Sequence, residues 1–191
     1  MHLTRYCMYQ RIQAVLQGRQ LTGRILGISG IKNFYPMIDW NNSHLVEVEY
    51  PEVDMQNLPF EEAEFDVVIS DQVLEHLPNP KRAIEESFRV LRPGGIAIHT
   101  TCFLNPIHEA PGDYCRLSKE ALSALCPPNV EAIHIGSWGN RIVLGLLLLR
   151  DGFRFIQIPP RSGFRRWLAT YNESKYPIVT WLIARKKANI G

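Results

Sequence analysis

The chain has 191 residues, of which 46% are apolar, and a formal net charge of +2. These values suit one domain with a three-layer core, and without a run of five like charges they argue against a general nucleic-acid surface. The four cysteines form no Cys-x-x-Cys pair, which argues against a zinc or redox motif and favours a reduced, cytoplasmic protein. We expect no signal peptide and no transmembrane segment, because the longest apolar run, Ile142 to Leu149, is far below the roughly 18 residues that span a bilayer.

The N-terminal part is predicted to begin with a helix. Tyr6 to Leu16 places most of its apolar residues on one side of such a helix, which we expect to pack beside a sheet or to cover a site. Arg24 to Ile28 predicts a first strand that ends in Ser29-Gly30. Asn33 to Trp40 predicts a short, irregular helix, and Leu45 to Glu49 a second strand.

The central part predicts a strand, a crossover helix and a second strand. Phe65 to Ser70 is short and rich in β-branched residues, as expected of a strand buried on both faces of a parallel sheet. Asn79 can cap the next helix and Pro80 can occupy its first position. From Lys81 to Leu91 apolar residues recur at helical spacing, and Ile96 to Thr101 predicts the next strand. Ligands of such sheets bind beyond the carboxyl ends of the strands.

The C-terminal part is predicted to close the sheet. Val130 to Ser137 and Ile178 to Ala184 read as antiparallel neighbours at the sheet edge. Between them, Arg141 to Arg150 is apolar on nearly every side, and aromatic residues alternate with arginines as far as Trp167. One interpretation is a buried helix under a loop. The other is a surface over residues 141–167 for a second copy of the chain, a membrane surface or a lipid-linked anionic substrate.

Four sequence segments together resemble class I S-adenosylmethionine-dependent methyltransferases of the ubiquinone-biosynthesis type (type 11). The segments are Asp54-x-x-x-Leu58-Pro59-Phe60, Phe65-Asp66-Val67-Val68, Val73-Leu74-Glu75-His76 and Arg89-Val90-Leu91-x-Pro93-Gly94-Gly95. The resemblance implies an α/β fold, a Rossmann-like three-layer sandwich with a mostly parallel sheet and an antiparallel C-terminal strand. It also implies S-adenosylmethionine as cofactor and methyl transfer to the oxygen, nitrogen or carbon of a small molecule.

The sequence departs from this family in two places. Gly27 stands where the family carries an acidic residue, and only Gly27 and Gly30 remain of its glycine-rich turn. Asp54 follows Glu49 by only five positions, whereas a parallel crossover needs about a dozen residues. We therefore predict that the family's third strand, at the sheet edge, is missing. These departures favour the alternative function, an inactive methyltransferase-like binding or scaffold module.

The resemblance also implies site residues. Glu49 would bind the ribose hydroxyls, Asp54 the adenine amino group and the Met55 amide the ring, although Asp54 could instead only cap a turn. The full set expected at the cofactor is Gly27, Ser29, Gly30, Glu49, Asp54, Met55, Asp71 and Gln72. The catalytic candidates are His108, Asp71 and His76, and no metal is implied. Histidine can accept a proton near neutral pH, but His108 could instead be structural, His76 could instead bond to backbone, and Asp71 could only cap its turn.

The chain is predicted to form a single domain with four parts. They are the N-terminal helix at 1–20, the cofactor-binding core at 24–103, a substrate loop and helix at 104–127, and a C-terminal hairpin with a helical insertion at 130–187. In the loop, His108 is the best-placed proton acceptor, and Arg116 could pair with Asp113 or bind an anionic substrate.

Overall fold

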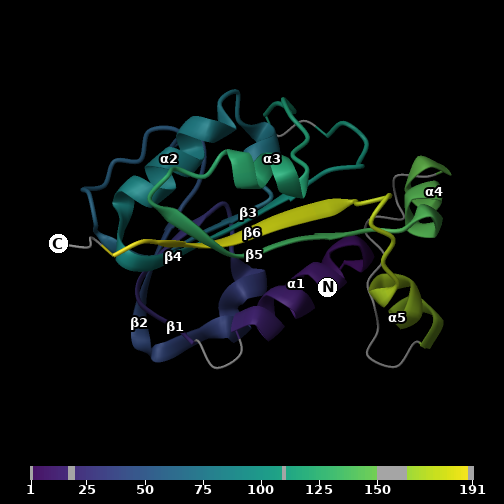
Figure 1. Cartoon of the computed structure of the whole chain (residues 1–191), viewed down its shortest axis with the longest axis horizontal. Coiled ribbons are helices and arrows are strands. Elements are labelled where there is room, and N and C mark those ends of the chain that lie inside the picture. Colours follow the sequence, from purple (N-terminus) through teal and green to yellow (C-terminus); the bar gives the residue numbers. More distant parts are fainter. Residues whose placement is uncertain (1, 17–19, 109–110, 150–162, 189–191) are drawn as a thin grey trace.

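A computed structural model describes residues 2–16, 20–108, 111–149 and 163–188, and it is built on one six-stranded sheet (Figure 1). The strands are β1 (Leu21–Ile28), β2 (Ile38–Val48), β3 (Phe65–Asp71), β4 (Leu91–Cys102), β5 (Val130–Trp138) and β6 (Val179–Lys186). Their order in the sheet is β2-β1-β3-β4-β6-β5. The first four strands run parallel, and β6 is antiparallel to both β4 and β5. The predicted mostly parallel α/β fold is confirmed.

Helices cover both faces of the sheet. The α-helices are α1 (Leu3–Leu16), α2 (Pro80–Val90), α3 (Lys119–Ala124), α4 (Arg141–Leu149) and α5 (Gly163–Thr170), and the 3-10 helices are η1 (Lys32–Met37) and η2 (Leu74–His76). Figure 1 shows α2 and α3 on one face, α1 on the other, and α4 at the end of the sheet where β4 finishes. The architecture is therefore a three-layer sandwich.

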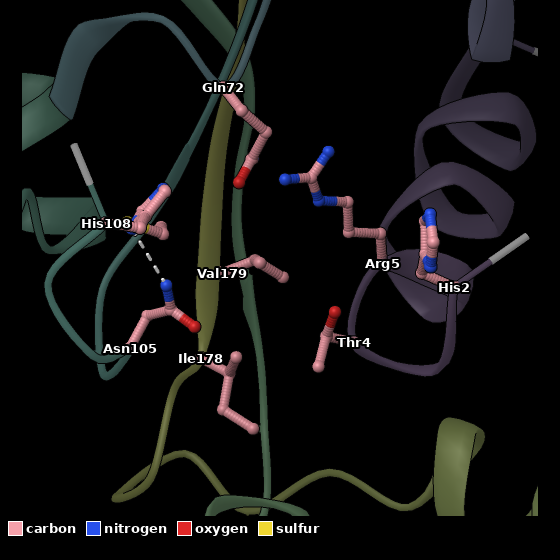
Figure 2. A pocket seen from close by; sticks show the side chains of 9 residues that line it. His2, Thr4, Arg5, Gln72, Asn105, His108, Ile178 and Val179 are labelled. Carbon is pink, nitrogen blue, oxygen red and sulfur yellow. Dashed lines mark hydrogen bonds between the residues drawn. The ribbon is translucent and has the colours of Figure 1, made fainter. Parts of the chain in front are cut away.

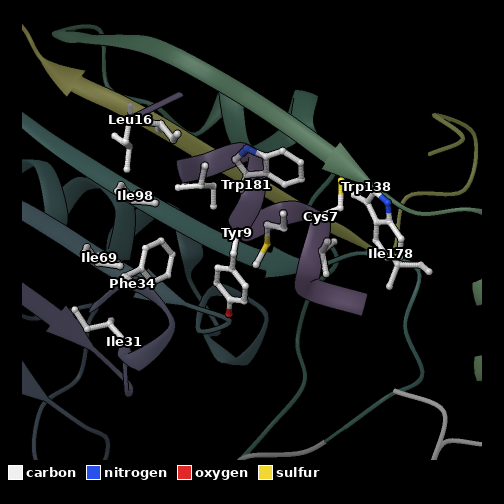
Figure 3. Close-up of a cluster of buried hydrophobic side chains, with 14 of the residues drawn as sticks. Cys7, Tyr9, Leu16, Ile31, Phe34, Ile69, Ile98, Trp138, Ile178 and Trp181 are labelled. Carbon is white, nitrogen blue, oxygen red and sulfur yellow. The ribbon is translucent and has the colours of Figure 1, made fainter. Parts of the chain in front are cut away.

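The two cores follow from the alternation of side chains along each strand. Val67 and Ile69 of β3 pack in the core beneath α1, whereas Val68 packs in the core beneath α2. The α1 side also buries the two large rings of Trp138 and Trp181 completely (Figure 3). A strand buried on both faces explains why the β3 sequence is a nearly continuous apolar run.

The start of α2 is fixed by the residues that the sequence indicated. The Asn79 side chain accepts a hydrogen bond from the backbone N–H of Arg82 at 3.1 Å, and Pro80 is the first helical residue. Further along, the buried Glu86 carboxylate accepts from the Leu58 amide at 3.0 Å and pairs with Arg89 at 2.8 Å. The hydrogen bonds from Arg89 hold the pKa of Glu86 below its usual value. This pair fastens the loop before β3 to the helix.

The predicted loss of the third strand at the sheet edge is confirmed. Residues 49–64, all of which the structure describes, contain no strand, and β2 forms the edge of the sheet. Two extents differ from the prediction. The second strand begins at Ile38 because its pairing with β1 extends back to Leu21, so the irregular helix is confined to η1. Helix α1 begins at Leu3 because Leu3, Cys7 and Met8 also face the core.

The interpretation as a buried helix is wrong for the described residues, which are α4 (Arg141–Leu149). Only Val143 and Leu147 of α4 are buried, while Leu148 and Leu149 are 72% and 81% exposed. The helix lies at the end of the sheet and packs through one face only, so its outer leucines have no cover among the described residues. The aromatic residues Phe153 and Phe155 lie outside the described part of the chain. No described helix is long and apolar enough to cross a membrane.

Candidate functional site

A cavity of about 460 Å³ lies at the carboxyl ends of β1 and β3. Its walls come from the ends of these strands, from the loop after β2, from η2 and from the loop after β4. Five residues of the expected cofactor set line it together: Ser29, Asp54, Met55, Asp71 and Gln72. The carboxyl edge of a parallel sheet is where α/β proteins bind ligands, so this cavity is the first candidate site.

Two residues at this edge have left-handed backbone conformations. Ser29, directly after β1, has a φ of 62°, and Gln72, directly after β3, has a φ of 60°. Non-glycine residues rarely adopt such angles, and where they do the strain often marks a functional site. Gln72 is held by Thr100, whose carbonyl oxygen accepts from its N–H and whose hydroxyl accepts from its Nε2, both at 3.0 Å. The Gln72 side-chain oxygen is thereby turned toward open space (Figure 2).

The two glycines of the first turn do not line this cavity. A Cβ at Gly27 would stand 2.8 Å from Cγ1 of Ile31, so this glycine makes room for a core side chain. Gly30, with a φ of 72°, serves the bend of the chain. Glu49 lies on a neighbouring cavity of about 420 Å³ that Ser29 also lines. The two glycines therefore shape the turn, and Ser29 between them lines the cavity.

Asp54 combines the two roles that the sequence left open. Its Oδ1 accepts from the Gln56 backbone N–H at 2.8 Å, which is a turn-capping bond, and both carboxylate oxygens accept from Gln56 Nε2. The same residue lines the cavity, and the adjacent Met55 is 2% exposed. Capping thus fixes the carboxylate at the cavity wall.

The Asp71 carboxylate accepts hydrogen bonds from side chains inside the protein. The Tyr9 hydroxyl donates to its Oδ2 and the Thr100 hydroxyl to its Oδ1, each at 2.6 Å, and Asn33 Nδ2 lies 3.4 Å from Oδ2. Burial, and then the neighbouring Asp71 carboxylate, raise the pKa of Tyr9. Asp71 therefore joins α1, β3 and β4 at the wall of the cavity, with only 7% of its surface exposed.

A second cavity of about 290 Å³ lies between the start of α1 and the loop after β4 (Figure 2). Its lining includes Thr4, Cys102, Asn105, Ile178 and Val179. Three further residues, Arg5, Gln72 and His108, line both cavities. The two spaces therefore meet at one point, with a cation, an amide and an imidazole around it.

The loop that carries His108 is fixed by an internal ion pair. Arg116 pairs with Asp113 and lowers the pKa of this carboxyl to about 2. Asp113 Oδ2 in turn accepts from the His108 backbone N–H at 2.9 Å. His76 lies beneath the same loop, where its Nδ1 donates to the Gly112 carbonyl at 2.6 Å and its ring meets that of His108 edge-to-face at 5.0 Å. His76 thus makes a hydrogen bond to the backbone, which is the alternative to catalysis that the sequence left open.

The orientation of the His108 ring leaves one nitrogen available. Nδ1 lies 3.2 Å from the Pro106 carbonyl oxygen and 3.5 Å from Asp113 Oδ2, both acceptors, and 3.2 Å from the donor Asn105 Nδ2. Two acceptors against one donor favour the hydrogen on Nδ1. Nε2 then keeps its lone pair and lies 4.0 Å from Oε1 of Glu75.

Sequence reasoning missed three residues at this junction. Glu75 is fully buried and accepts from the Thr101 hydroxyl at 2.7 Å, and burial together with this carboxylate raises the pKa of the neighbouring Cys102 thiol. No pattern in the sequence indicates that Glu75 or Cys102 lies near His108. Arg5 could have been found, because it precedes the buried residues Tyr9 and Ile12 by four and seven positions, which is one face of a helix.

Comparisons with known proteins agree with this geometry. A family model described as "Methyltransferase domain" matches residues 10–99. A probable S-adenosylmethionine-dependent methyltransferase of Mycolicibacterium smegmatis is 42% identical over 72 residues, covering 35% of this chain and 27% of the relative. A ubiquinone biosynthesis O-methyltransferase of Pseudomonas putida is 39% identical over 62 residues, covering 32% of this chain and 27% of the relative. The chain thus spans less than a third of the length of these relatives.

Solved structures show the same fold at low sequence identity. The carbon methyltransferase of CurJ has a TM-score of 0.58 at 13% identity, covering 95% of this chain and 53% of that one. The [4+2]-cyclase SpnF has a TM-score of 0.56 at 18% identity, covering 95% of this chain and 82% of that one. A cyclase among these structures shows that the fold alone does not specify the reaction. The match over residues 10–99 supports a class I, S-adenosylmethionine-dependent methyltransferase domain, and the sheet order and the cavity at the strand ends agree with it.

Proposed function

We propose that this protein transfers the methyl group of S-adenosylmethionine to a small-molecule acceptor held in the smaller cavity. The observation that carries the proposal is the meeting of the two cavities at Arg5, Gln72 and His108. Methyl transfer needs two substrates in contact and in line, and positioning supplies much of the rate. Two adjoining cavities with a shared opening provide such an arrangement.

The residues of the larger cavity fit the cofactor. Its volume of about 460 Å³ lies in the usual range for small-molecule sites, and it combines apolar walls with a few polar groups as such sites do. Val53, Met55 and Leu77 offer apolar surface for a flat ring, and the Asp54 carboxylate offers acceptors for an amino group. The Arg5 guanidinium offers a partner for the cofactor's carboxylate. When bound, S-adenosylmethionine supplies an electrophilic methyl group on a sulfonium.

The roles of the remaining candidates differ in this proposal. His108 accepts the proton of the acceptor through Nε2, because this nitrogen keeps its lone pair and its ring lines both cavities. Asp71 and His76 act as positioning residues, Asp71 through Tyr9 and Thr100 and His76 through the Gly112 carbonyl. Glu49 reaches the ribose hydroxyls from the adjoining cavity, while Gly27 and Gly30 shape the turn. The four cysteines are all unpaired, which supports a reducing, cytoplasmic environment as a prediction.

Replacing Asp54 by alanine should weaken S-adenosylmethionine binding by about tenfold or more, because a charge-assisted hydrogen bond contributes about 1.5–3 kcal/mol. Isothermal titration calorimetry measures the affinity. Asp39→Ala is a matched control, since the Asp39 carboxylate also accepts from the backbone N–H two residues further on, that of Asn41, at 3.1 Å, but does not line the cavity. An unchanged affinity of the Asp54→Ala variant would contradict the proposal that the adenine binds beside Asp54. Failure of the wild type to bind at millimolar cofactor would favour the scaffold alternative.

We also propose that α5 contacts an anionic lipid surface. The rings of Phe164 and Trp167 on this helix and of Tyr171 directly after it stack in a row, with centroids 6.0 and 5.4 Å apart, and all three are exposed. Arg165 and Arg166 lie beside them and are also exposed. Aromatic rings beside arginines are typical of helices that lie at a membrane interface. Helices α4 and α5 lie toward the same end of the sheet (Figure 1).

The double substitution of Phe164 and Trp167 by alanine should abolish flotation of the protein with phosphatidylglycerol vesicles. Wild-type protein should float with these vesicles and not with phosphatidylcholine vesicles, because the arginines need an anionic surface. Trp40→Ala is the control, since Trp40 on β2 is 48% exposed and Trp167 is 49% exposed. The proposal is wrong if the wild-type protein is monomeric by light scattering and floats with neither kind of vesicle. A dimer broken by the double substitution would instead assign the surface to a second copy.

A further inference from the structure

We infer that Glu75, Cys102 and His108 form a binding site for Zn²⁺ in the wall of the smaller cavity. Each residue offers one ligand atom, and these atoms all lie within 4.8 Å of one another. They come from three separate parts of the fold, namely η2, the last residue of β4 and the loop that follows. The assignment concerns metal binding and does not depend on the proposed methyl transfer.

The Glu75 carboxylate shows that this place is built for a cation. Its side chain is fully buried, and its Oε2 accepts from the Thr101 hydroxyl at 2.7 Å. Its Oε1 has no hydrogen-bond partner among the described residues, and it lies 4.0 Å from His108 Nε2. A buried carboxylate oxygen without a partner is costly unless it is paired or coordinates a metal. A cation between these atoms would satisfy it.

The chemistry of the three ligands favours Zn²⁺. An oxygen, a nitrogen and a sulfur ligand suit a borderline-soft ion, whereas Mg²⁺ and Ca²⁺ prefer oxygen alone. The Pro106 carbonyl and Asp113, beside the other ring nitrogen of His108, provide the outer partners that orient a ligating histidine. Cys102 and His108 line the smaller cavity, so a fourth ligand position faces this space. Three protein ligands and one open position are typical of reactive zinc sites.

The spacing requires only a small closure. Zinc–ligand bonds of about 2.0–2.3 Å place tetrahedral ligand atoms roughly 3.5 Å apart, compared with distances of up to 4.8 Å here. Glu75 and Cys102 are buried at the ends of regular elements, whereas His108 stands in a segment without regular secondary structure and its side chain is 22% exposed. The closing movement of about 1 Å would therefore fall on His108.

Zn²⁺ at this site would also affect the proposed reaction. The metal would take the Nε2 lone pair of His108, the same pair that is proposed to accept a proton. His108 cannot bind Zn²⁺ and accept a proton at the same time, so Zn²⁺ should inhibit methyl transfer. This consequence alone rests on the proposed function.

The test measures metal binding directly on the full chain. Zn²⁺ affinity is determined by competition with a chromophoric chelator, and Co²⁺ is added separately as a spectroscopic probe. Wild-type protein should bind one equivalent of Zn²⁺, and Co²⁺ should give a thiolate charge-transfer band in the near ultraviolet. Cys102→Ser should lose this band and bind Zn²⁺ more than about tenfold more weakly, and Glu75→Gln should also weaken binding. Circular dichroism checks that each variant is folded.

Cys115→Ser is the matched control. Cys115 is also free, half-buried and close to Glu75, but its Sγ donates to the Leu74 carbonyl oxygen and it is not one of the three ligands. Its substitution should leave both the Zn²⁺ affinity and the Co²⁺ band unchanged. Absence of stoichiometric binding in the wild type, or binding that survives Cys102→Ser, overturns the inference. Because no cofactor or acceptor is present, neither result bears on whether the protein transfers methyl groups.

Discussion

Replacing His108 by glutamine is expected to lower kcat by about 10²–10⁴-fold, the usual contribution of a general base. S-adenosylmethionine affinity should stay within about twofold, because the imidazole acts on the proton of the acceptor and the cofactor's apolar and carboxylate contacts lie elsewhere in the larger cavity. The rate is measured by transfer of a radiolabelled methyl group to an acceptor found by screening small hydroxyl, amine and carbon-acid compounds. Calorimetry gives the cofactor affinity.

His44→Gln is the control for this result, since His44 lies exposed on the edge strand β2 and should change neither quantity. A normal kcat in His108→Gln would remove the proton-acceptor role. A parallel loss of cofactor affinity would show that His108 supports the cofactor instead. The assay contains a chelator, so that the proposed zinc site does not influence the comparison.

Replacing Asp71 by alanine should lower the free energy of unfolding by about 3–5 kcal/mol. The substitution leaves the hydroxyls of Tyr9 and Thr100 buried without their acceptor, and it separates α1 from the two central strands. Urea denaturation followed by circular dichroism measures the loss. Tyr9→Phe removes one of the donors and should cost about 1–2 kcal/mol. Because the two residues share one bond, the double variant should lose less than the sum of the single losses.

Asp66→Ala is the control, because it removes an aspartate that is less buried than Asp71 from the same strand. Asp66 is also on β3, but its side chain is 33% exposed and pairs with Arg92 on the surface. Its substitution, which also removes a hydrogen bond from the Arg24 amide at 2.7 Å, should cost about 1–2 kcal/mol. A similar loss for both aspartates would mean that the network around Asp71 contributes little.

The fold was predictable wherever short-range signals determine it. The Asn79-Pro80 pair marks the first turn of α2, and the apolar run after Glu64 marks β3, because each depends on residues adjacent in the chain. The loss of the edge strand was predictable from length alone, since no crossover fits between Glu49 and Asp54. Local chemistry and chain length thus determine most of the sheet.

The remaining features depend on packing between distant segments. The outward face of α4 was misjudged because its leucines look suited to a core, and only the place of the helix at the end of the sheet leaves them uncovered. The approach of Glu75 to Cys102 depends on the parallel register of β3 and β4, in which Asp71 pairs with Thr100. The entry of Arg5 between the two cavities depends on how α1 crosses the sheet. Periodicity does not determine any of these relations.

The missing outer strand has a consequence for self-association. Strand β2 pairs with β1 alone among the described strands, and a sheet edge of this kind can template the addition of a strand from another molecule. Here the edge is interrupted by polar side chains, and Asn41, Asn42, His44 and Glu47 are all exposed. Charged and amide groups along such an edge disfavour apolar pairing with a second sheet. Because no further described strand covers β2, its own polar side chains protect this edge of the sheet against aggregation.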